Sequence, residues 1–444
     1  MGTTQKDLFY DAQNGLYPNA FIALAGTIEA PYNLYLHLPE HYPDGDPDHH
    51  RLLDYGVSIA NCYSHYNNRL RMLIQQQTDH TYVSNQALPT SIRFTHTEPQ
   101  LFLGHRGRGK STTLANKIQW LIKNHHQPIL VVTPFEHNRQ TLYQKLPANL
   151  PIFYLPPDDA LRRLPNINHL IIDEAAALPP AQLLALTQYY PAYTLATTTD
   201  GYEGSANTFH TKTLSKLALS PHQIYNLTTA YRFSANDSLE QLIQNLTLSN
   251  TLQTPVTATH NLSIQSVSAS NLLTDEKLLH TLWQLLQQAH YRNRPEDLKR
   301  LLDLPNQTIY IAFKEKKLVS VLHLLIEPPL PLELAKAVMT GERRPRGRLL
   351  MQQLLIHTQQ IQWAMQPLVR IHRIATLADY RKQNIASQLI QQAEKSFSPL
   401  PIGVIHTHSP ELDNFWQKLH YQERYRTPYQ RSRHLSVTSI RIRT

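Results

Sequence analysis

The chain has few of the features that mark secreted or membrane-bound proteins. Its 444 residues include a single cysteine, Cys62, so no disulfide can form within the chain. This scarcity is typical of a reducing compartment. The N-terminus has no apolar core of the kind found in signal peptides, and no apolar run approaches the roughly 20 residues needed to span a bilayer. We therefore expect a cytoplasmic protein without a membrane anchor.

The sequence is also poor in acidic residues relative to basic ones. Lysine and arginine together number 42 against 33 aspartates and glutamates, a formal net charge of +9 before any of the 24 histidines is protonated. That balance favours a polyanionic partner, above all a nucleic acid. The length exceeds that of one typical core, so two or three domains are expected.

The most informative segment contains a phosphate-binding loop. Residues 104–111 read GHRGRGKS and match the pattern G-x-x-x-x-G-K-[ST]. The apolar run Leu101–Leu103 precedes this loop, and Thr112–Lys123 has the apolar spacing of a helix. In such a loop, backbone N–H groups surround the phosphates, the lysine reaches the β- and γ-phosphates, and the serine hydroxyl ligates magnesium. The expected ATP contacts are Gly104, His105, Arg106, Gly107, Arg108, Gly109, Lys110, Ser111 and Thr112.

A second motif follows further along the chain. The apolar run His169–Ile172 ends in Asp173 and Glu174. In phosphate-loop ATPases such an aspartate holds the magnesium, and the following glutamate orients the attacking water. Pro128–Thr133 and Thr194–Thr199 read as further buried strands. Strands that alternate with helical segments indicate a parallel sheet covered on both faces.

The C-terminal part contains another strand, loop and helix. Arg373–Thr376 reads as a strand, and Ser387–Lys395 reads as a helix with one apolar face. The intervening Arg381–Ala386 resembles the acetyl-CoA loop of the GNAT acetyltransferases, whose pattern is [QR]-x-x-G-x-[GA]. In that loop, backbone N–H groups at a helix N-terminus hold the pyrophosphate of coenzyme A. Asn384 stands where glycine is usual, and asparagine is the other residue that best tolerates a positive φ.

Together the two sites resemble the tRNA(Met) cytidine acetyltransferase family, in which a helicase-type ATPase module is fused to a GNAT module. The resemblance extends over residues 100–435. It includes further segments that are similar to family motifs, namely Asp173–Pro179, Gly201–Ser205, Tyr231–Phe233 with Asp237–Glu240, His290–Asn293, Gly341–Gly347, and Ser409–Leu412 with Phe415–Trp416.

The resemblance implies an ATP-dependent enzyme. It would move an acetyl group from acetyl-CoA to the exocyclic amine of the wobble cytidine of elongator tRNA(Met), forming N4-acetylcytidine. Catalytic roles would fall to Lys110 and Glu174, with Mg²⁺ at Ser111 and Asp173. Arg232 would contact ATP. The residues implied at the acetyl-CoA site are Ile374, Ala375, Thr376, Arg381, Lys382, Gln383, Asn384, Ile385, Ala386, Ser387, Glu411 and Lys418.

Two roles have a plainer alternative. His290 is the candidate base for the acetyl transfer, because it lies in a matched segment and imidazole titrates near neutral pH. The alternative for His290 is a helix cap or a surface residue. The compact basic segment is expected to contact tRNA phosphates through Arg343, Arg344, Arg346 and Arg348, and the arginines of the tail between Arg424 and Arg443 share this interpretation. The alternative for both basic segments is a solvated face.

The expected fold is α/β. A small N-terminal mixed domain over residues 1–95 would precede a P-loop parallel-sheet ATPase domain over 96–250 and an α+β GNAT-fold domain over 255–444 with a basic C-terminal tail. A strand-separating helicase is not expected, because only one phosphate-loop domain is present. No obligate protein partner is evident.

Some departures from the family pattern leave the substrate open. The chain is shorter than typical bacterial members, with little room for a C-terminal tRNA-binding extension, and Lys418 stands where arginine is usual. Three alternatives therefore stay open: acetylation of a different wobble nucleoside, an RNA-stimulated ATPase whose GNAT domain is not catalytic, and a protein acetyltransferase.

Overall fold

A computed structural model describes most of the chain, namely residues 5–76, 91–125, 127–198, 209, 213–233, 237–249, 262–288, 293–314, 316–427 and 437–444. The chain divides into two compact units. Unit 1 comprises Met1–Pro39, Leu70–Asn250 and His290–Asp297, and unit 2 comprises Glu40–Arg69, Thr251–Ala289 and Leu298–Thr444. This division differs from the three expected segments, because residues 1–95 are shared between the two units.

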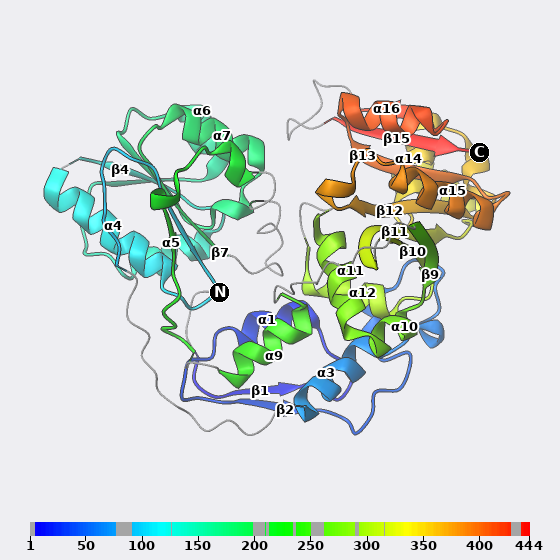
Figure 1. The fold of residues 1–444 in the computed structure, drawn as a ribbon, viewed down its shortest axis with the longest axis horizontal. Helices are drawn as coiled ribbons and strands as arrows, with labels where there is room; N and C mark the ends of the chain where they lie inside the picture. The colour runs from blue at the N-terminus through cyan, green and yellow to red at the C-terminus, as the bar shows by residue number, and fades with distance from the viewer. Residues whose placement is uncertain are drawn as a thin grey trace. The chain divides into compact units, whose positions relative to one another are not determined.

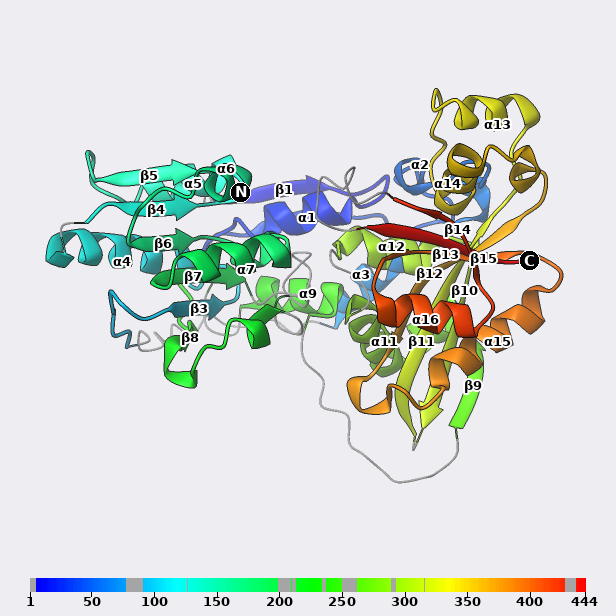
Figure 2. The same cartoon turned by 90° about the horizontal axis from the view of Figure 1, so that it is seen from above.

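Unit 1 is built on a six-stranded parallel sheet with the strand order β5-β4-β6-β7-β3-β8. Figure 1 labels β4 and β7 of this sheet, and Figure 2 labels all of its strands. Its strands are β3 (Gln100–Gly104), β4 (Ile129–Val132), β5 (Ile152–Leu155), β6 (His169–Ile172), β7 (Tyr193–Thr198) and β8 (Ile224–Asn226). Strands β3, β4, β6 and β7 lie where the apolar runs predict them, and each is buried along its whole length. Full burial follows from cover on both faces, as in other parallel sheets.

Helices cover both faces of this sheet. On one face Phe102 packs with α4 (Lys110–His125) and α5 (Glu136–Tyr143). On the other face Leu101 and Leu103 pack with α6 (Pro157–Arg163) and α7 (Pro180–Tyr189). Alternate residues of β3 serve the two cores because successive strand side chains point to opposite faces. The predicted α/β architecture is confirmed.

The N-terminal part of unit 1 is small. Strands β1 (Leu8–Asp11) and β2 (Leu34–His37) pair in parallel, with α1 (Pro18–Ala25) between them in sequence. Helix α9 (Ser238–Thr247) packs against α1, and the Asp237 carboxylate caps α9 by accepting from the N–H groups of Leu239 and Glu240.

Unit 2 contains a seven-stranded sheet in the order β14-β15-β13-β12-β11-β10-β9 (Figure 2). Its strands are β9 (Leu262–Val267), β10 (Gln307–Lys314), β11 (Lys317–Glu327), β12 (Leu368–Thr376), β13 (Ile402–Thr407), β14 (Gln422–Arg426) and β15 (Thr438–Arg443). The neighbours β12 and β13 are parallel, and the other recorded pairs in this sheet are antiparallel. This mixed sheet agrees with the α+β architecture expected of the C-terminal part.

Two cores flank the seven-stranded sheet. One contains α15 (Ile385–Phe397) and α16 (Pro410–Lys418), and the other contains α13 (Leu332–Met339) and α14 (Leu349–Thr358). The remaining helices with residues in unit 2 are α2 (His49–Leu52), α3 (His65–Gln75), α10 (Ala269–Thr274), α11 (Glu276–Gln288) and α12 (Pro295–Asp303). Among the helices described here, none combines the length and the apolar character required to cross a membrane.

Unit 1 contains a fully buried lysine side chain. Lys117 of α4 has no exposed side-chain surface, and its ammonium group donates to the Thr95 carbonyl and, at 2.7 Å, to Gln100 Oε1. The rings of Phe94 and Trp120 lie 5.4 and 5.0 Å from the ammonium nitrogen. Because burial disfavours the charged form, the pKa of Lys117 falls from 10.5 to about 7.

This burial predicts a pH-dependent stability. Above a pH of about 7 the folded chain releases the Lys117 proton, whereas the unfolded chain retains it until the pH approaches 10.5. The free energy of unfolding of the wild type should therefore rise with pH relative to Lys117→Met, by up to about 1.4 kcal/mol per pH unit. Urea unfolding of both proteins between pH values of about 7 and 9.5 measures this difference, and parallel profiles would contradict it.

Candidate functional site

The phosphate loop lies between the end of β3 and the start of α4. Gly107 and Gly109 both have a positive φ, 77° and 75°, and Gly109 immediately precedes the first residue of α4. A side chain at Gly109 would lie 2.8 Å from the Tyr231 ring. The loop therefore needs glycine at this position for its conformation and for the close packing of Tyr231.

Lysine, serine and aspartate converge at this loop as the sequence predicts. The Lys110 ammonium donates to the carbonyl oxygens of Gly104 and His105, each at 3.0 Å. Ser111 Oγ donates to Asp173 Oδ2 at 3.3 Å, although 62 positions separate them in sequence. Strand β7 lies between β3 and β6, so the sheet order brings the ends of the two motif strands to the same edge. A hydroxyl and a carboxylate oxygen in this arrangement suit Mg²⁺, which prefers oxygen ligands.

The carboxyl group of Asp173 is 1% exposed. Burial raises its pKa to about 6, while Lys110, the Glu174 N–H and the Ser111 hydroxyl oppose this shift. A cation near this carboxylate would restore the charged form, because opposite charges favour ionisation. Glu174 follows in a left-handed backbone conformation with φ 53°, and its carboxylate accepts from Thr198 Oγ1 at 3.4 Å.

Arg232 lies beside the phosphate loop. Its Cβ is 3.0 Å from the position that a side chain would occupy at Gly107, and the neighbouring Tyr231 N–H donates to the Gly107 carbonyl at 3.0 Å. The guanidinium group of Arg232 donates to the Gly26 carbonyl at 2.6 Å. The sequence indicated no chemistry before residue 95, yet Gly26, at the end of α1, contacts a predicted ATP-binding arginine.

Two other loop positions have arginines with neighbours in unit 1. Arg108 donates to both carboxylate oxygens of Glu240, at 2.8 and 2.9 Å. The Arg106 guanidinium lies 2.7 Å from the position of a side chain added to Gly26. His105, Arg106 and Arg108 thus belong to the described loop, and their contacts with ATP stay a prediction. The segment Gly201–Ser205 lies outside the described residues.

The candidate acetyl-CoA loop connects β12 to α15. Asn384 has φ 62° and immediately precedes Ile385, the first residue of α15. Lys382 also has a positive φ, 61°. Arg381 Nε donates to the Thr376 carbonyl at 3.1 Å, and Gln383 accepts from Lys314 at 2.7 Å. Asparagine therefore adopts the left-handed conformation that the sequence pattern requires here.

Helix α15 matches the predicted helix and extends beyond it at both ends. Ile385, Leu389, Ile390 and Ala393 are its buried residues. Ala386 and Ser387 lie in its first turn, where backbone N–H groups lack partners within the helix. Such a turn is a ready site for an anion.

The two parallel strands of unit 2 separate near this loop. Pairing between β12 and β13 is confined to Val369–Ile371 and Ile402–Val404. Strand β12 continues to Thr376 and β13 continues to Thr407, each paired only with its outer neighbour. Ile374, Ala375 and Thr376 are therefore paired with β11 and not with β13. The carbonyls of Ala375 and Thr376 already accept from Ser320 Oγ and Arg381 Nε. Backbone groups that no neighbouring strand pairs at such a divergence can bind the amides of an extended ligand.

Three further candidates have a weaker structural basis. Glu411 and Lys418 lie in the first and last turns of α16 and are exposed. No described contact joins either residue to the loop before α15, so their place at the acetyl-CoA site stays a prediction. His290 lies outside the described residues, and its role as the base stays a prediction too.

The four arginines predicted to contact RNA have different surroundings. Arg343, Arg344 and Arg346 are exposed. Arg348 is 1% exposed, and its guanidinium donates to the Tyr55 carbonyl. A buried guanidinium with this contact supports the loop, so the expectation of a phosphate contact at Arg348 is not supported by its position.

The basic tail is largely neutralised where it is described. Arg426 and Arg441 both donate to the Glu423 carboxylate, at 2.6 and 2.9 Å. Arg443 donates to Glu394 at 2.7 Å. Paired arginines contribute less attraction for RNA than their number in the sequence suggests.

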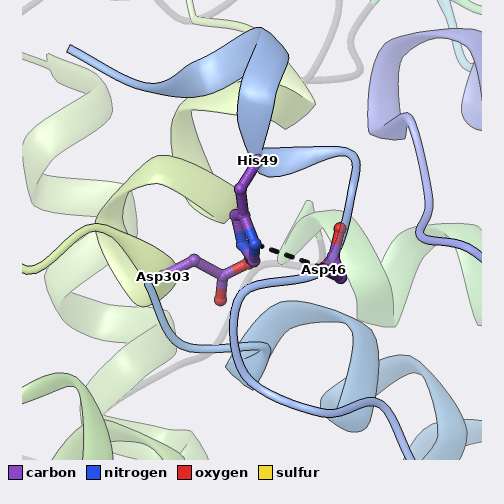
Figure 3. Close-up of side chains that lie close together, drawn as sticks. All are labelled: Asp46, His49 and Asp303. Carbon is purple, nitrogen blue, oxygen red and sulfur yellow. Dashed lines mark hydrogen bonds and ion pairs between the residues drawn. The ribbon is translucent and has the colours of Figure 1, made fainter. Parts of the chain in front are cut away.

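Unit 2 also contains a buried ionic cluster that the sequence did not indicate (Figure 3). His49 lies between Asp303, 3.0 Å from Nε2, and Asp46, 3.5 Å from Nδ1. The three side chains are close enough to share a cation, but the Lys299 ammonium lies 3.6 Å from Asp46 and each imidazole nitrogen faces a different carboxylate. Asp303 also accepts from the Tyr66 N–H at 2.9 Å. These contacts describe an ion network that attaches residues 46–66 to α12.

Comparison with known proteins assigns both parts of the chain. The model of the family described as RNA cytidine acetyltransferase NAT10/TcmA, helicase domain, matches residues 101–250, and the GNAT acetyltransferase 2 model matches residues 281–400. The tRNA(Met) cytidine acetyltransferase TmcA of Idiomarina loihiensis is 30% identical over 437 residues, which cover 95% of this chain and 69% of that protein. The TmcA of Photorhabdus asymbiotica is 28% identical over 453 residues, covering 93% of this chain and 64% of the relative.

Acetyltransferases are among the solved structures to which the chain is similar. A polyamine N-acetyltransferase of Drosophila melanogaster is 12% identical, with a TM-score of 0.29, and the match covers 41% of this chain and 99% of that chain.

The geometry of Asn384 generates a prediction. Asn384→Gly should retain acetyl-CoA binding, because glycine also adopts the left-handed conformation. Asn384→Val should weaken binding roughly fivefold to thirtyfold, since a β-branched residue there costs about 1–2 kcal/mol. Gln391→Val, at an exposed position of the same helix, is the control for valine itself. Calorimetric titration with acetyl-CoA measures all three, and equal affinities for the valine variants would contradict the assignment.

Proposed function

Because this chain belongs to the tRNA(Met) cytidine acetyltransferase family, we propose that it acetylates the exocyclic amine of the wobble cytidine of elongator tRNA(Met), using acetyl-CoA and ATP. One observation supports this most directly. The same chain has a phosphate loop with its aspartate, and a strand divergence followed by a left-handed residue and a helix N-terminus. The first arrangement suits a nucleoside triphosphate, and the second suits coenzyme A. The chain spans about two thirds of the length of the relatives it matches.

The acetyl transfer requires close positioning. A cytosine amine is a weak nucleophile, because its lone pair is delocalised into the ring. The enzyme must hold this amine near the thioester, accept its proton and stabilise the oxyanion that forms. The C–S bond of the thioester then breaks, and coenzyme A leaves as its thiolate. In the proposed site, the first turn of α15 would hold the pyrophosphate of coenzyme A, and the side of β12 at Ile374–Thr376 that is not paired with β13 would bind the extended part of that molecule. His290 is the proposed base.

ATP would occupy the site in unit 1. Lys110 would leave its two carbonyl partners to reach the β- and γ-phosphates, and Arg232 would neutralise the charge that develops on the γ-phosphate. Ser111 and Asp173 would hold Mg²⁺, which screens the phosphate charge when bound. Glu174 would orient the attacking water. We propose that hydrolysis drives a rearrangement of the tRNA that presents the wobble base.

The activity itself can be tested directly. Purified protein incubated with bulk tRNA, ATP and labelled acetyl-CoA should yield N4-acetylcytidine at the wobble position of methionine tRNA. Mass spectrometry of the nucleosides identifies the product. Label on another nucleoside would change the acceptor, and labelled protein without labelled RNA would replace the proposal with a protein acetyltransferase.

The role of ATP gives a separate prediction. Lys110→Ala should lower ATP hydrolysis by about a hundredfold or more, because the γ-phosphate loses its principal cation. Acetylation of tRNA should fall with it, while acetyl-CoA binding should not change. Lys123→Ala, at an exposed position of the same helix, is the matched control. Full tRNA acetylation by Lys110→Ala would contradict a role for hydrolysis in presenting the base.

A further inference from the structure

The predicted RNA-binding arginines share a surface with a distant part of the chain. The Tyr55 N–H donates to the Arg346 carbonyl at 2.9 Å, and the Arg346 guanidinium donates to the Arg51 carbonyl. In return, the Arg348 guanidinium donates to the Tyr55 carbonyl. Residues 51–55 therefore run beside residues 346–348, although 295 positions separate Arg51 from Arg346 in the sequence.

Buried polar contacts hold this arrangement in place. Gly347 has φ 79°, and a side chain there would lie 2.0 Å from Asp54 Cγ, so glycine is required for the close approach. The Asp54 carboxylate, 4% exposed, accepts from Arg300 at 2.8 Å and from Asn306 at 3.1 Å. The chain after Arg348 is fixed as well, because the buried Glu327 carboxylate accepts from the first N–H groups of α14, those of Leu350 and Met351.

Cationic and aromatic groups are exposed on this surface. Arg343, Arg344 and Arg346 are exposed, and no ion pair with Arg343 or Arg344 occurs within the described part of the chain. Tyr55 is 40% exposed. The centroid of its ring lies 5.7 Å from the guanidinium carbon of Arg348, which is buried. The arginines of the tail differ, because Arg426, Arg441 and Arg443 are paired with carboxylates.

This combination matches the chemistry of RNA more closely than that of other polyanions. Guanidinium groups without a carboxylate partner attract phosphates, and a partly exposed ring offers a face on which an unpaired base can stack. An acidic protein or an anionic surface would use the charges but not the ring. Loop nucleotides of a folded RNA would use both.

We propose that Tyr55, Arg343, Arg344 and Arg346 form one RNA-binding surface, here called the Tyr55 surface. The arginines contact phosphates, and Tyr55 stacks on an unpaired base. This inference rests on the proposed function, which supplies tRNA as the partner. It gives residues 46–66 a role: the Asp46–His49–Asp303 cluster attaches this segment to α12 and so positions Tyr55 beside the arginine loop.

The charges are tested by the salt dependence of tRNA binding. The double variant Arg343→Gln with Arg344→Gln should reduce the slope of log affinity against log salt by about 0.7–0.9 per lost contact, and should weaken binding roughly tenfold or more at low salt. The control is Arg162→Gln with Arg163→Gln, which removes two charges from exposed positions of α6. Equal slopes for the two double variants would overturn the phosphate contacts.

The Tyr55 ring is tested by the affinity for tRNA, while the salt dependence of binding should stay the same. Tyr55→Ala should weaken tRNA binding about fivefold to a hundredfold without changing the salt slope, since stacking releases no counterions. Tyr55→Phe keeps the ring and should bind as the wild type does. Thermal melting checks that each variant is folded, and Tyr55→Leu carries the test if the alanine variant is not. A Tyr55→Leu protein that is folded and binds tRNA as tightly as the wild type would overturn the stacking contact.

Two controls separate this inference from the proposed function. Wild-type protein that neither binds nor acetylates tRNA would remove the function itself. Wild-type protein that acetylates tRNA, with every Tyr55-surface variant equal to its control, would remove only the inference. Heparin serves as a polyanion without bases. The inference would also be overturned if the arginine variants lost heparin binding and tRNA binding to the same extent and if Tyr55→Ala affected neither.

Discussion

Both nucleotide-type sites depend on a single backbone constraint, a left-handed residue directly before a helix. Gly109 precedes α4 and Asn384 precedes α15, with φ values of 75° and 62°. This conformation turns the chain sharply after a strand, so that the first N–H groups of the helix point toward the space beyond the strand end. Without it, neither loop could bring those donors to a phosphate. The rest of each unit keeps the strand and the helix in place around that turn.

The surroundings of the two loops come from remote segments. Around the phosphate loop, Asp173 arrives from a strand two places away in the sheet, and Arg232 contacts both the loop and Gly26. Around the arginine loop, residues 51–55 supply the neighbouring backbone and Tyr55. Gly26 thus lies beside the predicted ATP site, and residues 51–55 lie beside the predicted RNA-binding arginines.

Buried polar and ionisable groups lie where these segments meet. Asp173 is held beside Lys110 and Ser111, Glu327 caps α14, and the His49 imidazole lies between two carboxylates. A buried charge without partners costs several kcal/mol, so each of these groups requires the contacts that surround it. Removal of one partner would leave the other buried without its hydrogen bond or ion pair. Such clusters therefore restrict how the segments can pack.

Local patterns were sufficient to predict much of the molecule. Glycine, lysine and serine at fixed spacing after an apolar run predicted the phosphate loop, and the tolerance of asparagine for positive φ predicted the conformation of Asn384. These features depend on a few neighbouring residues, and the sequence alone determined them. His290 lies outside the described residues, so its predicted role still rests on the sequence. Only the tertiary structure decided that Arg348 is buried and Arg343 exposed, that Glu240 pairs with Arg108, and that Tyr55 lies beside Arg346. Those outcomes depend on which distant segments pack together, and no local spacing encodes that choice.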